Sequence, residues 1–388
     1  MLKSTRKPRN HSSIFIAAII FSILLLGCGS GLKYKREGAL HIPWHSGWLL
    51  PRYDGYNTGF VDRELKLPLE LKWEYKTSAA VTANCIGNEY FIVAGDLTGN
   101  LYMINTANGK KMSKESMKGV ITAPPLLKDS LLFFSTNTKN DRFGAINIKS
   151  GEILWENEGM DFSTIFSVGR GALYIGGGNG RIGAWRVANG SEVWSKIGNM
   201  QTSGGCITRD TIVFAAFSNG NVTAYNSLTG EKLWQRKLGA AQSGHITITD
   251  SLVICAGLDS TVHLLDTESG SEIWDYQVDG VIRGGVSIAG NLCYFGCNSG
   301  KLFAIDIENH SELFYFQTDD PITTSVLITK NKVAFGSLDG RLYILNRFTG
   351  ELLFQYETED QIISSPILAG NGIAFSCHNK KLLYLYPH

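Results

Sequence analysis

The residue patterns that most often carry catalysis or ligand binding are rare in this sequence of 388 residues. The segment Gly178-Asn179-Gly180-Arg181-Ile182-Gly183 matches the GxGxxG pattern of nucleotide-binding loops, but it joins two strand-like stretches. Phosphate binding by such a loop requires a strand followed by a helix, so we interpret the segment as a hairpin turn. The sequence has no P-loop, zinc-protease motif or nucleophile elbow. We therefore expect no catalytic residue, no metal ligand and no bound cofactor.

Cys28 is the one residue whose sequence context predicts a chemical modification. Four cations precede an unbroken apolar stretch, which is the pattern of a bacterial export signal: Lys3, Arg6, Lys7 and Arg9, then Ile14 to Leu26. The stretch is shorter than the about 20 residues of a membrane span, and it ends in Leu25-Leu26-Gly27-Cys28, which resembles a lipobox. We expect a signal peptide over residues 1–27 and acyl chains on Cys28 that anchor the protein. An uncleaved anchor or a simple secretory signal is the alternative.

The other cysteines show no spacing typical of disulfides or metal ligands. They lie in strand-like apolar runs without CxxC pairs: Cys85, Cys206, Cys255, Cys293, Cys297 and Cys377. We predict that they are buried as small hydrophobic residues.

The charge balance excludes several classes of partner. The chain has 36 Lys and Arg against 35 Asp and Glu, and loss of the signal leaves 32 against 35. A surface with so little net charge favours neither nucleic acid nor general binding to anionic membranes. The content of 43 Gly and only 9 Pro suits tight turns between many short strands.

From residue 70 onward the sequence repeats with a period close to 40 residues. The clearest copies are AINIKSGEILW (Ala145 to Trp155), AWRVANGSEVW (Ala184 to Trp194), AYNSLTGEKLW (Ala224 to Trp234) and LLDTESGSEIW (Leu264 to Trp274). Each copy has a turn glycine, and His310 stands where one glycine is missing. A period of about 40 residues is the size of one four-stranded propeller blade.

Each repeat divides into four strands whose residue types suit different distances from a central axis. The first is small and polar, as in Arg283-Gly284-Gly285, and the second is apolar, as in Lys332-Val333-Ala334-Phe335, which suits a strand buried on both faces. The fourth carries an aromatic residue that fills the widening wedge between blades. The structural repeat residues of this kind are Trp73, Trp155, Trp194, Trp234 and Trp274.

The strand count predicts both the number of blades and the way the ring closes. First strands are expected near Val81, Ile121, Ser163, Thr202, Gln242, Ile282, Ile322 and Ile362. The chain ends after only seven outer strands, and residues 69–75 can supply the eighth. The sequence therefore predicts an all-β fold, an eight-bladed β-propeller of four-stranded antiparallel blades over residues 69–388. Residues 28–68 are expected to form a tether and lead-in.

These repeats resemble the family of pyrroloquinoline-quinone-like β-propeller repeats, whose consensus is close to A-x-D-x-x-T-G-x-x-x-W. The resemblance covers residues 70–386, and the segment from Trp48 to Gly59 is similar to the lead-in of such proteins. Within the family, a lipoprotein of this length resembles the non-enzymatic lipoproteins of outer-membrane β-barrel assembly. The resemblance is specific for the fold and weak for function, because dehydrogenases and binding scaffolds share the repeat.

A quinone-dependent dehydrogenase or ligand sensor of the same family is the alternative. Such an enzyme would need carboxylates or Asn at the axis to hold a calcium ion beside the quinone. The inner-strand residues align as one column: Thr82, Thr122, Thr164, Ser203, Ser243, Arg283, Thr323 and Ile363. This column has no carboxylate, which favours the scaffold.

Two features point to partner binding. Arg283 is the only charge in the inner column and can either grip a carboxylate or form an internal salt bridge. Acidic residues recur on the face of the blade-entry loops, where they form either a surface for a basic partner or a solvated rim: Asp259, Asp279, Asp319, Asp320, Asp339, Glu359 and Asp360. We expect a monomeric propeller within a complex, lipid-anchored in the cell envelope at the periplasmic face of the outer membrane. It would bind envelope proteins, with possible contacts at Arg283, Asp319, Asp320 and Asp360.

Overall fold

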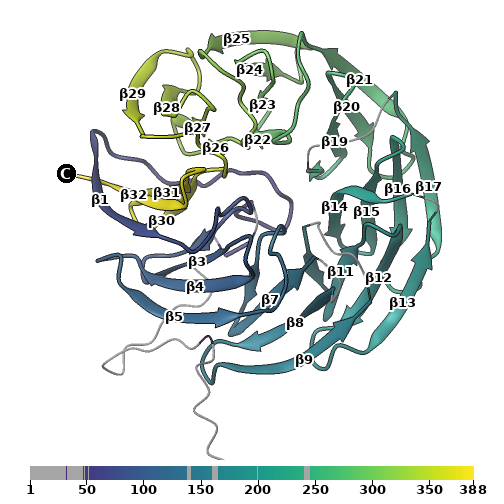
Figure 1. Cartoon of the computed structure of the whole chain (residues 1–388). Coiled ribbons are helices and arrows are strands. Elements are labelled where there is room, and N and C mark those ends of the chain that lie inside the picture. Colours follow the sequence, from purple (N-terminus) through teal and green to yellow (C-terminus); the bar gives the residue numbers. More distant parts are fainter. Residues whose placement is uncertain are drawn as a thin grey trace, which may run out of the picture.

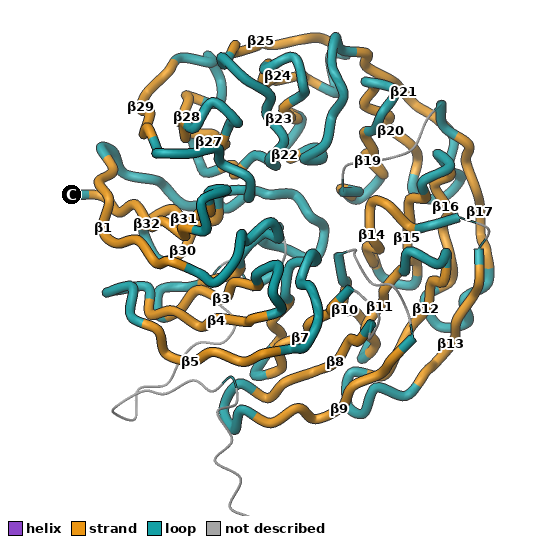
Figure 2. The backbone as a smooth tube through the Cα atoms, in the orientation of Figure 1, coloured by secondary structure: helices purple, strands orange, loops and turns teal. Residues whose placement is uncertain are grey.

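The computed structural model describes residues 32, 47, 49, 50, 52–137, 141–159, 165–198, 200–239 and 245–388. Within this part every named element is a strand, and the strands form eight four-stranded antiparallel sheets. The sheets follow one another around a ring (Figure 1), with loops at both ends of the strands (Figure 2). The prediction of an eight-bladed propeller is confirmed. Among the described residues there is no helix of the length and apolarity needed to cross a membrane.

The blades are numbered in chain order, and their strands are given from the axis outward. Blade 1 consists of β2 (Ile86–Gly87), β3 (Phe91–Gly95), β4 (Asn100–Asn105) and β5 (Lys111–Ser116), and blade 2 of β6 (Leu126–Lys128), β7 (Leu131–Thr136), β8 (Arg142–Asn147) and β9 (Glu152–Glu158). Blade 3 consists of β10 (Ser167–Gly169), β11 (Ala172–Gly176), β12 (Arg181–Arg186) and β13 (Glu192–Ile197), and blade 4 of β14 (Thr202–Arg209), β15 (Ile212–Phe217), β16 (Asn221–Asn226) and β17 (Lys232–Lys237). Blade 5 consists of β18 (Thr247–Ile248), β19 (Leu252–Ala256), β20 (Thr261–Asp266) and β21 (Glu272–Gln277), and blade 6 of β22 (Ser287–Ala289), β23 (Leu292–Gly296), β24 (Lys301–Asp306) and β25 (Ser311–Gln317). Blade 7 consists of β26 (Leu327–Ile328), β27 (Lys332–Gly336), β28 (Arg341–Asn346) and β29 (Leu352–Glu357), and blade 8 of β30 (Ile367–Ala369), β31 (Gly372–Ser376), β32 (Lys381–Pro387) and β1 (Leu69–Lys76).

The ring closes by pairing the two ends of the propeller, as predicted. Strand β1 pairs antiparallel with β32 from Leu69 opposite Pro387 to Lys76 opposite Lys381, with a register shift between Leu71 and Trp73. The last blade therefore takes its outer strand from the start of the propeller, and β32 has no unpaired edge.

Burial follows the distance from the axis. Every residue of β3 and β27 is buried, which agrees with the apolar sequences expected for second strands. The outer strands alternate, and β21 runs from half-buried to exposed residues in turn. The hydrophobic core thus lies between blades, and one cluster joins residues of blades 7, 8 and 1.

The predicted starts of the first strands are wrong for most blades. Only β14 begins where expected, at Thr202. Five others begin five residues later, and the starts expected at Ser163 and Gln242 lie outside the described residues. The small residues before these strands serve close packing between blades: a Cβ on Gly284 would lie 2.3 Å from the Thr324 carbonyl oxygen. Gly285 has a positive φ of 78°. Such a segment approaches its neighbour too closely for a regular strand pairing.

The GxGxxG segment is a hairpin, as interpreted. Gly180 lies in the turn between β11 and β12, and its φ of 80° is the left-handed conformation that glycine adopts readily.

Candidate functional site

The lead-in crosses the ring at its axis. Its backbone carbonyls accept hydrogen bonds from inner strands of blade 2 and of blades 5, 6 and 7, on the opposite side: Leu127 to Leu49, Ile248 to Tyr56, Ile288 to Thr58 and Ile328 to Gly59, at 2.8 to 3.0 Å. In Figure 1 the purple segment before β1 passes through the centre of the ring. The backbone N–H of Lys330, in the β26–β27 turn, donates to the Arg63 carbonyl. The lead-in therefore covers the end of the axis on the face of this turn.

Arg52 of the lead-in is buried against the inner strands of blades 5 and 6. Its side chain is 1% exposed, donates to Thr247 Oγ1 at 3.0 Å and to the Val286 carbonyl at 2.8 Å, and also bonds Ser287. Burial lowers the pKa of Arg52 to about 10, and the charge of Asp54 opposes that shift. Burial and the Arg52 charge lower the pKa of nearby His245 to about 3. The sequence marked Arg52 only as part of the lead-in, because nothing local indicates contacts 195 residues away.

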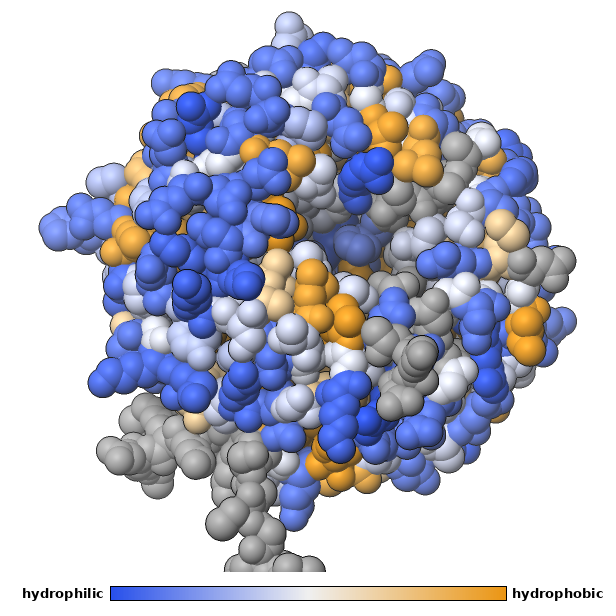
Figure 3. All heavy atoms as spheres, viewed as in Figure 1, coloured by the Kyte–Doolittle hydropathy of each residue, from blue (hydrophilic) through white to orange (hydrophobic). Residues whose placement is uncertain are grey.

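The other end of the axis carries the inner column. Thr82 and Arg283 are exposed there, and Thr122, Ser203, Thr323 and Ile363 are half-buried, whereas Thr164 and Ser243 lie outside the described residues. In the view of Figure 3 the molecule is hollowed at the centre of the ring and its surface is mostly hydrophilic. Arg283 forms no ion pair within the described chain, so the internal salt bridge, one of the two alternatives, is not seen there.

These axial side chains do not fit a calcium-held quinone. Calcium prefers carboxylate and carbonyl oxygens, whereas the described column offers hydroxyls, one isoleucine and one guanidinium. Among the described residues no three His, Cys, Asp or Glu side chains are grouped as metal ligands would be. No reaction step can be derived through such a cofactor here.

The acidic residues of the loop face are partly neutralised by bases that the sequence analysis missed. Three successive blades repeat the same ion pair between an acid after an outer strand and the first residue of the next blade's third strand: Asp279–Lys301 at 2.6 Å, Asp319–Arg341 at 2.6 Å and Glu359–Lys381 at 2.7 Å. The hydrogen bond from Lys301 lowers the pKa of Asp279. The constant separation of 22 residues was the available signal.

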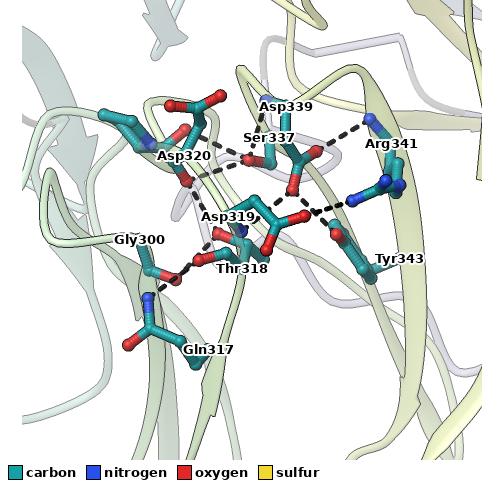
Figure 4. A network of polar contacts seen from close by, with 10 residues as sticks. Gly300, Gln317, Thr318, Asp319, Asp320, Ser337, Asp339, Arg341 and Tyr343 are labelled. Atoms are coloured by element: carbon teal, nitrogen blue, oxygen red, sulfur yellow. Dashed lines mark hydrogen bonds and ion pairs between the residues drawn. The ribbon is translucent and has the colours of Figure 1, made fainter.

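The contacts around Asp319 separate paired acids from free ones (Figure 4). Asp339 accepts hydrogen bonds from the Tyr343 hydroxyl at 2.7 Å and from the backbone of Asp319 at 3.3 Å. Burial and this bond to Asp339 raise the pKa of Tyr343 to about 12, so the hydroxyl remains a donor. The exposed Asp320 uses its carbonyl within the network, while its carboxylate points away and has no partner among the described residues.

Asp360 is also on this face. Its carboxylate accepts a hydrogen bond from the Gln361 backbone at 2.8 Å and lies 3.9 Å from Nδ1 of His378. The structure thus brings Asp319, Asp320 and Asp360 to consecutive blade entries, and Asp320 has the least engaged carboxylate of the three.

The outer-strand tryptophans pack between blades as predicted. Trp73, Trp155, Trp194 and Trp234 are 7 to 9% exposed, and each indole donates to a backbone carbonyl of the next blade at 2.8 to 3.0 Å. Trp274 is only half-buried and stacks on His310, with ring centroids 4.8 Å apart.

Of the two predictions for cysteines, one is confirmed and the other is not tested. The six cysteines from Cys85 to Cys377 are free and buried, which is confirmed. Burial raises the pKa of Cys85 and Cys206 to about 12, so these thiols are not reactive nucleophiles. Cys28 lies outside the described residues, and its acylation stays a prediction.

Comparisons with solved structures return the same fold from proteins of different activities. BamB from Moraxella catarrhalis is 14% identical, with a TM-score of 0.70 over 82% of this chain and 100% of that chain. Quinohemoprotein alcohol dehydrogenase from Comamonas testosteroni is 13% identical, with a TM-score of 0.75 over 87% and 80%. The computationally designed Ika8 protein is 17% identical, with a TM-score of 0.72 over 80% and 97%. At these identities the likeness concerns the fold.

A comparison with curated proteins gave no match. The family model described as "Outer membrane protein assembly factor BamB" matches residues 69–204, 178–315 and 218–384, which together span the propeller. The chain therefore belongs to the family of the outer membrane protein assembly factor BamB.

Proposed function

We propose that this protein is a non-enzymatic, lipid-anchored scaffold that binds envelope proteins during assembly of outer-membrane β-barrels. The family match and the fold shared with BamB support an envelope role. The observation that carries the proposal is that the chain crosses its own axis. The lead-in bonds to inner strands of blades 2, 5, 6 and 7, where a ring of inner strands would otherwise leave room for a ligand.

The two faces of the ring have different tasks in this proposal. The lead-in lies on the face of the β26–β27 turn, so a tether from Cys28 approaches from that side. The acidic residues lie on the other face, after the outer strands. That face points away from the membrane and is open to proteins of the periplasm.

Asp320 is the residue we expect at the centre of the partner surface. Its carboxylate is exposed and unpaired within the described chain, whereas Asp319 is held by Arg341 at 2.6 Å. A partner's Lys or Arg can pair with Asp320 without breaking an internal bond. Such pairs affect orientation and association rate more than affinity.

Site-specific photo-crosslinking in native envelopes tests the proposal. A photoreactive residue replaces Asp320 in the full-length chain, and the control replaces Glu268, which is exposed in the β20–β21 turn on the opposite face. We expect barrel-assembly components to be captured from position 320 and not from position 268. Equal capture from both positions, or capture of no assembly component, would contradict the proposal.

A further inference from the structure

Blades 6 and 7 fill the gap to the preceding blade with aromatic rings from one row of cross-strand partners. In blade 6 this row is Phe295, Phe303 and Tyr315, which are cross-strand partners. The first two rings stack with centroids 5.6 Å apart, and the next pair is 6.2 Å apart. In blade 7 the rings of Phe335 and Tyr343 stack at 5.4 Å. Aromatic rings thus occupy this wedge.

Blade 4 leaves the same row empty of rings. Its cross-strand partners are Ala215, Thr223 and Gln235. Blades 2 and 3 have glycine in the middle position, but there a ring of the same blade fills the space: Phe134 is 3.1 Å from the Cβ position of Gly144, and Trp185 is 2.9 Å from that of Gly183.

A hollow lies beside this row, between blades 3 and 4. Its volume is about 280 Å³, close to the lower limit of small-molecule sites. The lining residues are Gly198, Met200, Phe217, Asn219, Asn221, Thr223, Tyr225 and Gln235.

The lining is neutral and rich in carboxamides. Asn221 occupies the position of Lys301 and Arg341 in blades 6 and 7, so the ion pair of those blades has no cation here. The side chains of Asn221 and Gln235 form no hydrogen bond within the described chain, which leaves their donors and acceptors available.

Two aromatic side chains lie beside these amides, and of these Tyr225 is half-buried. Phe217 is 5% exposed, and the ring of Tyr225 packs against Trp194 with centroids 6.3 Å apart. Burial raises the pKa of the Tyr225 hydroxyl.

We propose that the hollow between blades 3 and 4 binds a neutral saccharide unit. Sugar hydroxyls both donate and accept hydrogen bonds, as carboxamides do, and the apolar face of a sugar ring can lie against Tyr225. No charged side chain is among the lining residues, and Lys237 beside them is bonded to the Asn219 carbonyl, which favours a neutral ligand. The site is separate from the acidic residues proposed to bind protein, and its failure would leave that proposal intact.

Calorimetric titration of the purified full-length chain tests this inference. The probes are glucose, N-acetylglucosamine and their linear trisaccharides, in a detergent without a sugar headgroup. We expect saturable binding of at least one probe. Gln235→Ala should weaken it by about tenfold, the effect of losing roughly 1.4 kcal/mol of hydrogen bonding. Thr223→Tyr should abolish binding, because the new ring would fill the hollow from the position that Tyr343 has in blade 7.

Gln355→Ala is the matched control, since Gln355 lies opposite Tyr343 as Gln235 lies opposite Thr223. It should leave binding unchanged, and thermal melts show that each variant is folded. The inference is overturned if no probe binds, if Gln235→Ala binds as the unmodified protein does, or if a neutral tripeptide such as triglycine binds where the sugars do not.

Discussion

The indole ring of Trp234 lies directly on Gly270 of the next blade, where a Cβ atom would be 2.5 Å from the ring. The same contact joins other pairs 35 or 36 residues apart: Trp73 and Gly109, Trp155 and Gly190, Trp194 and Gly230, and Phe314 and Gly350. Each of these glycines also has a positive φ. One residue therefore satisfies the turn and the contact between blades, and both requirements favour glycine.

Replacing Trp234 by Ala should lower the free energy of unfolding by about 3 to 5 kcal/mol, as for other large buried aromatics. The loss includes the hydrogen bond from the indole to the Thr267 carbonyl at 3.0 Å. Equilibrium urea denaturation measures it, and Trp274→Ala, at a half-buried position, should cost less. A loss below about 1 kcal/mol at Trp234 would contradict its assigned place in the core.

Gly270→Ala should destabilise the protein more than Gly290→Ala. Both positions have φ near +65°, but a Cβ at Gly290 meets nothing within 4 Å. The Gly290 variant thus measures the left-handed backbone alone, about 1 to 2 kcal/mol. Gly270→Ala adds the clash with Trp234, which costs about 1 to 3 kcal/mol more. Equal losses in urea denaturation would show that the ring moves aside freely.

The repeat made most of the fold predictable because each residue of its signature answers a local demand. Gly230 has a positive φ in its turn and lies against the ring of Trp194, so a tryptophan and a glycine recur at fixed spacing. Where the glycine is replaced by His310, Trp274 is half-buried instead. The closure by residues 69–75 followed from counting outer strands.

Contacts between distant segments were not predictable in the same way. Arg52 lies 195 residues from Thr247 in the chain, and no local pattern indicates that the two meet. The residues before the first strands look like strand, but close approach between blades, as at Gly284, prevents regular pairing there. The ion pair of Asp319 with Arg341 joins two blades, so reading acids alone overstated the free negative charge.

Replacing residues 69–75 by a Gly-Ser linker of equal length should destabilise blade 8 most. Strand β32 would lose its pairing from Leu69 to Tyr75 and expose an edge. Hydrogen exchange should rise over residues 362–386 before it rises elsewhere. An even rise over all blades, or no change, would argue against closure by this strand as a local stabiliser.

His245→Asn should flatten the fall in stability on acidification. Folding lowers the pKa of His245 to about 3 from 6.5, so the unfolded chain binds the proton more readily between these values. The stability due to neutral His245 is therefore present above pH 6.5 and is lost as the pH falls toward 3, by about 1.4 kcal/mol per pH unit. Urea denaturation at pH 6 and pH 4.5 compares the two proteins, and parallel losses would contradict a lowered pKa of His245 in the folded protein.

Adding pyrroloquinoline quinone with calcium should neither raise the melting temperature nor confer dye-linked oxidation of alcohols or sugars. The described axial column offers a quinone only hydroxyls, Ile363 and Arg283 at one end, and the lead-in crosses the axis at the other. A ligand at 100 times its dissociation constant would stabilise the protein by about 2.7 kcal/mol, which a thermal melt detects readily. A shift that is abolished by Arg283→Ala would identify a quinone site at the open end of the axis and would favour the dehydrogenase or sensor over the scaffold. A shift that survives this variant but is lost in Arg52→Gln would instead show that the lead-in moves out of the axis to admit a ligand. Without any shift, the axis acts as the place where the lead-in ties blades 5, 6 and 7 together, and binding is left to the outer surfaces of the ring.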